Sequence, residues 1–220
     1  MTTLYTGLTP PDADCIHTPL IEITPVDDDA ALQSAARAID RYDYVLFTSR
    51  FAVKHFCPLL HHPSSIIHHT SSIIHHTSSI IHHPSIVSIG STTTAALYKI
   101  GIKEVQQVDV DNSYGVIAWF RSQPCGRVLI PRSNLALPII PEGLRELGFE
   151  VDCITAYRNQ MPAHPRKICL DEVDRIVFTS PSTIDHFIRL YGSLPEGKVL
   201  VTRGPVTEQY LQTMIKQQNS

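Results

Sequence analysis

The sequence predicts an α/β protein made of two similar halves, each with a parallel sheet. Short apolar runs rich in β-branched residues alternate with segments of helical periodicity, as in strand–helix–strand units. Residues 44–56 align without gaps to residues 175–187, and five of 13 positions are identical, including Phe-Thr-Ser. Residues 86–97 then align to residues 200–211 and share Val, Gly, Thr and Leu. Two matches in the same order indicate a repeated unit, strand–FTS–helix followed by strand–GxxT–helix.

The individual elements follow from local patterns. Residues 28–39 carry apolar side chains at helical spacing, and residues 142–147 are followed by Gly148, a typical helix stop. The β-branched apolar runs place the strands, in chain order, at 16–23, 44–48, 86–89, 105–110, 128–131, 151–155, 176–179 and 199–202.

Composition limits the class of function. The chain has 220 residues and 24.6 kDa, 43% hydrophobic and 18% charged, which fits one large or two small domains with a real core. Lys and Arg number 18 against 21 Asp and Glu, a net charge of −3 that argues against nucleic-acid binding. No apolar run reaches the roughly 18 residues that span a bilayer, and the N-terminus lacks signal-peptide features. We therefore expect a cytosolic protein with neither membrane nor nucleic-acid partners.

Cysteine spacing and a histidine tract bear on metal binding. The five cysteines are scattered and never spaced CxxC, which favours reduced thiols over disulfides or a zinc site. Paired histidines recur in the tandem heptad SSIIHHT, SSIIHHT, SSIIHHP at residues 64–84. Paired imidazoles suit Zn, Ni or Cu, but a repetitive tract supplies no oriented second shell. We therefore predict no physiological metal site and only adventitious binding.

The same tract explains the main difference between the halves. From Phe47 to Gly90 is 43 residues, whereas from Phe178 to Gly204 is 26, a surplus of 17. The three heptads nearly account for this surplus. We interpret residues 61–84 as a low-complexity insert in a helix-to-strand connection, forming a frayed helix or a surface loop.

The FTS turns are candidate anion sites. Each lies where a parallel strand ends and a helix begins, so Ser49 and Ser180 are expected to be N-caps, and Pro181 suits the first helical position. Free backbone N–H groups and the helix dipole favour anions at such turns. Plain capping is the alternative for any one turn.

The GxxT turns extend this pattern. Gly90 and Gly204 permit tight bends, and Thr93 and Thr207 offer hydroxyls in the first helical turn. Because open α/β sheets bind ligands at the carboxyl ends of their strands, four such turns facing one another would line an anion-binding cleft. The phosphate-loop patterns GxxxxGK[ST] and GxGxxG are absent from the sequence, as are HExxH and GxSxG.

Three further residues stand out by their positions. Arg132 follows a strand end and is either a carboxylate partner or a solvated loop arginine. Tyr157 follows a strand just before the second half of the chain. Its phenol either donates a proton or fills space as an aromatic side chain at a hinge. The ordinary tyrosine pKa near 10 suits a proton donor at neutral pH. His186 aligns with His55, which indicates a structural helix position for both.

Five motifs in order resemble the uroporphyrinogen-III synthase family, and the match covers nearly the whole chain. They are VLFTSRFAV, SIGSTTTAAL, VLIPRSNLALPIIPEGLRELGFEVDCITAYRN, IVFTSPSTIDHF and RGPVT. The resemblance implies two α/β domains joined by a two-stranded linker, with a ligand cleft between them. One domain would be discontinuous, residues 1–24 with 160–220, and the other would be residues 27–154.

The resemblance also implies an activity. The family cyclises hydroxymethylbilane, a linear tetrapyrrole with eight carboxylates, to uroporphyrinogen III, with loss of water and inversion of the last ring. It uses no metal or organic cofactor, so none is expected here. A cytoplasmic monomer that receives its substrate from hydroxymethylbilane synthase is implied as well. The rival hypothesis is a non-catalytic anion-binding module or an inactive relative.

The family's functional positions carry over residue by residue. Tyr157 matches the tyrosine proposed to assist loss of water. Thr93 and Thr207 match the threonines of the GxxT turns. The remaining substrate-binding candidates lie in the corresponding turns: Thr48, Ser49, Arg50, Arg132, Ser133, Ser180, Ser182 and Gly204.

Overall fold

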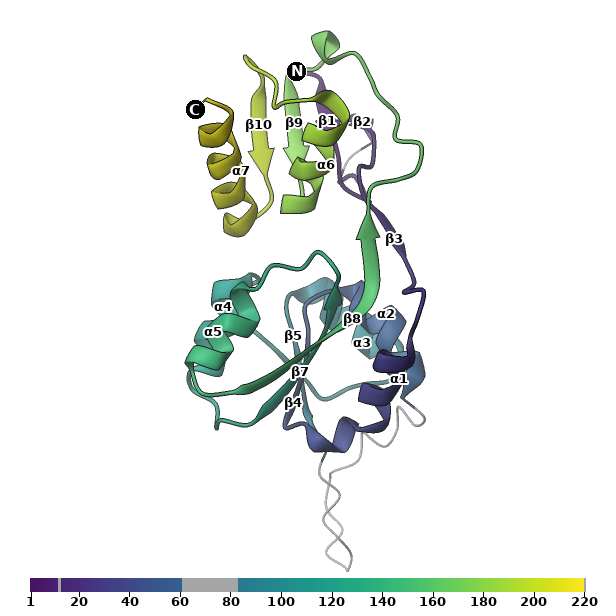
Figure 1. Cartoon of the computed structure of the whole chain (residues 1–220), viewed down its shortest axis with the longest axis vertical. Helices are drawn as coiled ribbons and strands as arrows, with labels where there is room; N and C mark the ends of the chain where they lie inside the picture. Colours follow the sequence, from purple (N-terminus) through teal and green to yellow (C-terminus); the bar gives the residue numbers. More distant parts are fainter. Residues whose placement is uncertain (12, 61–82, 220) are drawn as a thin grey trace, which may run out of the picture. The chain divides into compact units, whose positions relative to one another are not determined.

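The protein contains two compact α/β units. A computed structural model describes residues 1–11, 13–60 and 83–219 (Figure 1). Unit 1 comprises Met1–Thr24 and Asn159–Ser220, and unit 2 comprises Pro25–Arg158. The predicted fold class is confirmed, with two sheets of parallel pairings, one of them split across the sequence. The predicted insert lies outside the described residues except at its last two positions.

Unit 1 is built on a four-stranded parallel sheet. Its elements are β1 (Thr3–Tyr5), β2 (Ile16–His17), the short 3-10 helix η4 (Leu170–Glu172), β9 (Arg175–Phe178), α6 (Pro181–Tyr191), β10 (Val199–Thr202) and α7 (Pro205–Gln218). The strands lie in the order β10-β9-β1-β2. The amino-terminal strand is therefore internal, with Leu4 opposite Ile16 on one side and Ile176 on the other.

The core of unit 1 holds these distant segments together. Leu4, Ile176, Phe178 and Phe187 are all buried. The rings of Phe178 and Phe187 meet edge to face, with centroids 5.4 Å apart. Burial of each large apolar side chain contributes about 1.5–3 kcal/mol, so the first strand is fixed by residues from the end of the chain.

Unit 2 contains most of a six-stranded sheet in the order β3-β8-β7-β4-β5-β6. The strands are β3 (Glu22–Thr24), β4 (Tyr44–Phe47), β5 (Ser85–Ser88), β6 (Val105–Gln107), β7 (Arg127–Ser133) and β8 (Glu150–Gln160). The helices are α1 (Ala30–Arg37), η1 (Ile39–Arg41), α2 (Arg50–Phe56), η2 (Cys57–Leu59), α3 (Ser91–Lys99), α4 (Ser113–Phe120) and α5 (Ile139–Glu146). The chain passes between the units at β3 and at the end of β8.

An aromatic cluster centres the core of unit 2. The Phe120 ring contacts those of Tyr44 and Phe149 edge to face, with centroids 5.3 and 5.2 Å away. Phe120 and Val128 are fully buried. The cluster packs α4 and α5 against β4 and β7, and so fixes the strands whose carboxyl ends carry the candidate site.

One predicted strand is two strands in the structure. Residues 16–23 form β2 and β3, separated by residues 18–21. Pro19 has no N–H to donate to a strand ladder, and Leu20 instead donates to the carbonyl of Thr6 at 2.9 Å. Strand β1 was not predicted, because a three-residue run shows too little periodicity.

Helix α4 was also not predicted from the sequence. Its residues, SYGVIAWF, are apolar on nearly all sides and lack an amphipathic period. Asn112 caps it, accepting hydrogen bonds from Tyr114 N and Gly115 N at 2.9 and 3.0 Å. A Cβ at Gly115 would lie 2.0 Å from the carbonyl oxygen of Val110. The helix therefore depends on close backbone approach and core burial.

The two GxxT helices begin alike but have different surroundings. Gly90 begins α3 with φ 70° and ψ 155°, and Gly204 begins α7 with φ 88° and ψ 159°. These conformations are nearly restricted to glycine. A Cβ at Gly90 would lie 2.3 Å from a carboxylate oxygen of Asp111, whereas, beyond its chain neighbours, no described residue has an atom within 4 Å of one at Gly204.

We expect Gly90→Ala to destabilise the protein more than Gly204→Ala does. Backbone strain costs each variant about 1–3 kcal/mol, and Gly90→Ala must also displace the Asp111 side chain. Urea unfolding of the full chain measures the difference. Adding Asp111→Ala to Gly90→Ala should bring its cost close to that of Gly204→Ala. Equal costs for the two single variants would contradict this account.

Candidate functional site

The FTS turn of unit 2 has the predicted capping geometry. Ser49 is extended, with φ −159°, and its Oγ accepts a hydrogen bond from Phe51 N at 3.0 Å. Thr48 and Ser49 are half-buried, and Arg50 is exposed with its guanidinium 5.0 Å from the centroid of the Phe51 ring. The N-cap prediction is confirmed, and the turn lies at the carboxyl edge of the sheet.

A β-bulge places Tyr157 at the same edge. Strands β7 and β8 pair in regular register until Arg132 opposite Thr155, and then Ser133 lies opposite Tyr157. Ala156 is the extra residue, so Ala156 and Tyr157 are both buried although they are neighbours in a strand. An extra residue in one strand changes the face of the sheet to which the side chains after it point.

The Tyr157 ring is packed against helix α2. Its centroid lies 5.9 Å from that of Phe51 and 6.1 Å from that of His55, and the His55 ring is stacked at 26°. Tyr157 is 7% exposed and forms a side-chain hydrogen bond with Ser49. The phenol is thus apolar along its ring and polar at its hydroxyl, as buried tyrosines usually are.

The environment of Tyr157 favours its protonated form. Burial raises its pKa above the ordinary value of 10.0, and the Ser49 hydrogen bond and the charge of Arg132 offset this rise in part. The group is therefore a neutral phenol at pH 7. Ser49 and Arg132 also stabilise the phenolate that forms if the proton is given away. This combination suits a general acid.

Arg132 and Ser133 organise the loop after β7. The guanidinium of Arg132 donates to the carbonyl of Leu137 at 2.8 Å and to that of Ala136. The Oγ of Ser133 accepts from Leu135 N at 3.1 Å. Arg132 is therefore bound to its own loop, a role that the sequence did not indicate, while its charge still acts on Tyr157.

The second turn of unit 2 is less suited to anions than expected. Thr93 lies in the first turn of α3, as predicted, but its side chain is buried. The Asp111 carboxylate, however, lies beside Gly90 at the start of this helix. A fixed negative charge there would repel a carboxylate ligand. No sequence signal linked Asp111 to this turn, because the two lie on different elements.

In unit 1 the FTS turn is a hydrogen-bonded cluster. Ser180 is the N-cap of α6 and Pro181 occupies its first position, as predicted. Oγ of Ser180 and Oγ of Ser182 lie 2.9 Å apart, and Nδ2 of Asn159 donates to Ser182 at 3.0 Å. Ser180 N also donates to the hydroxyl of Thr183 at 3.3 Å. Ser182 is thus buried and bonded within its own unit.

The GxxT turn of unit 1 is the more open of the two. Gly204 is exposed and Thr207 is buried in the first turn of α7. In the same turn Glu208 accepts a hydrogen bond from Thr202 at 2.7 Å, and bonds from Gln212 and Thr202 lower the pKa of its carboxyl. The predicted residues of unit 1 therefore follow neighbouring strands β9 and β10 at one edge.

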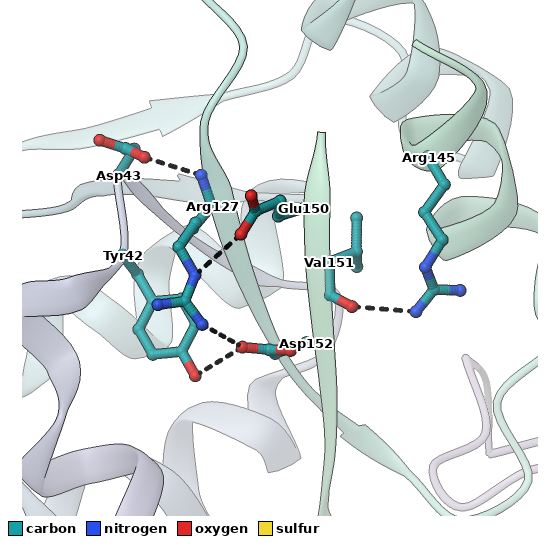
Figure 2. Close-up of polar contacts among 7 residues, drawn as sticks. All are labelled: Tyr42, Asp43, Arg127, Arg145, Glu150, Val151 and Asp152. Carbon is teal, nitrogen blue, oxygen red and sulfur yellow. Dashed lines mark hydrogen bonds and ion pairs between the residues drawn. The ribbon is translucent and has the colours of Figure 1, made fainter. Parts of the chain in front are cut away.

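A network of charged side chains, bonded to one another, lies at the opposite edge of the larger sheet from Tyr157 (Figure 2). Arg127 lies across from Glu150 at the start of β7 and β8 and contacts Glu150 and Asp152 at 3.3 and 3.1 Å. Its backbone N donates to Asp43 at 2.7 Å, and the Tyr42 hydroxyl donates to Asp152 at 3.0 Å. These bonds fix the register of β7 and β8 at this edge, and the bulge follows further along the same pair of strands. The charge of Arg127 is already neutralised by Glu150 and Asp152.

Metal and membrane features are also absent from the described parts of the chain. Within residues 1–11, 13–60 and 83–219, no group of three or more His, Cys, Asp or Glu side chains could hold a metal ion. Over the same ranges no helix has the length and apolar character to cross a bilayer.

Burial raises the pKa of the Cys57 thiol to about 12, which makes it a poor nucleophile.

Comparisons with known proteins agree on a family. The family model described as Uroporphyrinogen-III synthase HemD matches residues 7–217. The putative uroporphyrinogen-III synthase of Methanothermobacter thermautotrophicus is 22% identical over 198 residues, 80% of this chain and 71% of that protein.

Solved structures with this fold include two synthases. A mutant uroporphyrinogen III synthase of Thermus thermophilus has a TM-score of 0.64 at 16% identity, over 97% of this chain and 88% of that chain. The Helicobacter pylori enzyme has a TM-score of 0.56 at 16% identity, over 96% and 88%. These likenesses show the fold, and the family model covers nearly the whole sequence. The chain therefore belongs to the uroporphyrinogen-III synthase family.

Proposed function

We propose that this protein is an active uroporphyrinogen-III synthase, which closes hydroxymethylbilane into uroporphyrinogen III with loss of water. The observation that carries the proposal is Tyr157, a buried neutral phenol whose hydroxyl is bonded to Ser49 and lies in the field of Arg132. The reaction needs a proton at the departing hydroxyl, and such a phenol supplies one.

The proposed reaction begins with departure of the hydroxymethyl oxygen. The C–O bond breaks as Tyr157 gives its proton to that oxygen, which leaves as water. The chain becomes an azafulvene cation, and the phenolate is stabilised by Ser49 and Arg132.

Ring closure then uses the reactivity of the substrate itself. The cation is attacked by the substituted carbon of the last pyrrole, giving a spiro intermediate that fragments and recloses with that ring inverted. The proton lost when the closed macrocycle regains aromaticity returns to Tyr157. No side chain has to act as a nucleophile.

Backbone N–H groups are proposed to hold the carboxylates. The turns at Thr48–Arg50, at Ser133, at Ser180 and at Gly204 offer helix starts or loop amides. The turn at Thr93 contributes less, because Asp111 lies beside Gly90. Ser182 and Thr207 are buried and are proposed to support these turns from beneath. Receipt of substrate from hydroxymethylbilane synthase, and action as a monomer, belong to the same proposal.

The isomer of the product tests the function. With freshly prepared hydroxymethylbilane we expect the type III isomer, separated chromatographically, in excess over a no-enzyme control. Hydroxymethylbilane left alone gives the type I isomer. Substrate binding with only type I product would instead favour the non-catalytic anion-binding module.

Removing the phenol hydroxyl tests the acid. Tyr157→Phe keeps the ring packing and should lower kcat at least about tenfold, as expected for loss of a general acid. Because the pKa of Tyr157 is raised, the wild-type rate should not fall until the pH exceeds 10. Tyr98→Phe, at an exposed position on α3, is the matched control and should leave the rate unchanged. A fully active Tyr157→Phe would remove the acid assignment.

Ser49 is expected to act on Tyr157 as well as on helix α2. Ser49→Ala and Asn112→Ala each remove an N-cap and should each cost about 0.5–2 kcal/mol of stability. Only Ser49→Ala should raise the pKa of Tyr157, measured by NMR of ring-labelled tyrosine, and lower kcat. The hypothesis fails if both variants leave that pKa where it is in the wild type.

A further inference from the structure

Two aligned histidines have different environments in the structure. His186 is buried, and its Nδ1 lies 2.6 Å from the carbonyl oxygen of Leu20, so it satisfies a backbone group in the core of unit 1. His55 occupies the same position on α2, but its Nε2 is buried with no hydrogen-bond partner among the described residues. The structural role inferred from the alignment therefore fits His186 and does not account for His55.

An imidazole with a buried, unpartnered nitrogen is a costly choice for packing alone. A buried polar atom without a hydrogen bond has lost its hydration and gained nothing in return. A leucine would fill a helix face without that cost. What His55 has instead is a ring contact with Tyr157, nearly parallel at 26° with centroids 6.1 Å apart.

Phe51 and His55 form one surface toward Tyr157. They are four residues apart on α2 and therefore share a helix face. Both rings lie within about 6 Å of the Tyr157 ring, at interplanar angles of 53° and 26°. Ser49, two residues before Phe51, is bonded to the phenol. One short helix thus contacts both the ring and the hydroxyl of the proposed acid.

We propose that His55 is a positioning residue for Tyr157, holding the phenol ring, together with Phe51, in the orientation that directs its proton to the substrate. The inference rests on the proposed function. His55 acts here as a flat neutral ring: burial, and secondarily the charge of Lys54, lower its pKa below the ordinary value of 6.5. It donates no proton and touches no reacting atom. Without it the ring can rotate away from Ser49, and small misplacements of a catalytic group cost large factors in rate.

The kinetic test compares three variants of the full chain. His55→Phe keeps a flat ring and should retain the wild-type kcat within about twofold. His55→Leu removes the ring and should lower kcat about tenfold with KM unchanged, because substrate contacts are untouched. His164→Leu changes an exposed histidine of unit 1 and should have no effect. A wild-type kcat for His55→Leu, or an equal loss in His55→Phe, overturns the proposal.

A second measurement does not depend on activity. With ring-labelled tyrosine, the Tyr157 signal is assigned by its loss in Tyr157→Phe and titrated in each variant. Because the Ser49 hydrogen bond lowers the pKa of Tyr157, rotation of the ring away from Ser49 in His55→Leu should raise that pKa further, and His55→Phe should not. An unchanged Tyr157 titration in His55→Leu overturns the positioning role.

The two measurements also separate the inference from the function. If the wild type makes no type III isomer, the proposed function fails while the titration still decides whether His55 holds Tyr157. If His55→Leu does not fold, Phe51→Leu removes the other ring contact and should produce the same loss of kcat and the same shift of the Tyr157 pKa.

Discussion

The extra residue in β8 is the constraint on which the geometry of the site depends. Strand side chains alternate between the two faces of a sheet, and the bulge at Ala156 interrupts that alternation just before Tyr157. Its place along the strand is set at the far end, where Arg127 is bonded to Asp43 on one side and to residues of β8 on the other. Each exposed ion pair adds little stability, but together they fix a register. Tyr157, the proposed acid, is therefore placed by strand pairing at one edge of the sheet and packed against helix α2 at the other.

The proposed reaction requires few groups besides a correctly placed Tyr157. A substrate that becomes a reactive cation on losing water requires a proton donor and a way to direct the attack. The donor is a phenol kept neutral by burial, with Ser49 and Arg132 available to its conjugate base. The two GxxT turns differ in their surroundings, since the Asp111 carboxylate lies beside Gly90 whereas no described residue crowds Gly204, although Glu208 places a carboxylate in the first turn of α7 as well.

Features that rest on short-range rules could be predicted from the sequence, and features that rest on tertiary contacts could not. The caps at Ser49 and Ser180 and the tight bends at Gly90 and Gly204 depend on a few adjacent residues. The bulge, helix α4 and the carboxylate beside Gly90 depend on pairing or packing between distant segments, which a single sequence does not display. The candidate site residues were chosen by family resemblance, but the binding of Arg132 to its own loop became visible only in the structure.

The split sheet of unit 1 also constrains biosynthesis. Strand β1 is synthesised before its partner β9, which begins about 170 residues later, with Thr3 opposite Arg175. Pro25–Arg158 is contiguous and can complete its own fold meanwhile, since domains generally fold as units during translation. Until the last segment emerges, Leu4 and Leu20 have no core to enter. The nascent chain therefore carries an apolar segment whose sheet still lacks β9 and β10, so chaperone protection at this stage would matter more for this protein than for one whose sheets are each continuous in sequence.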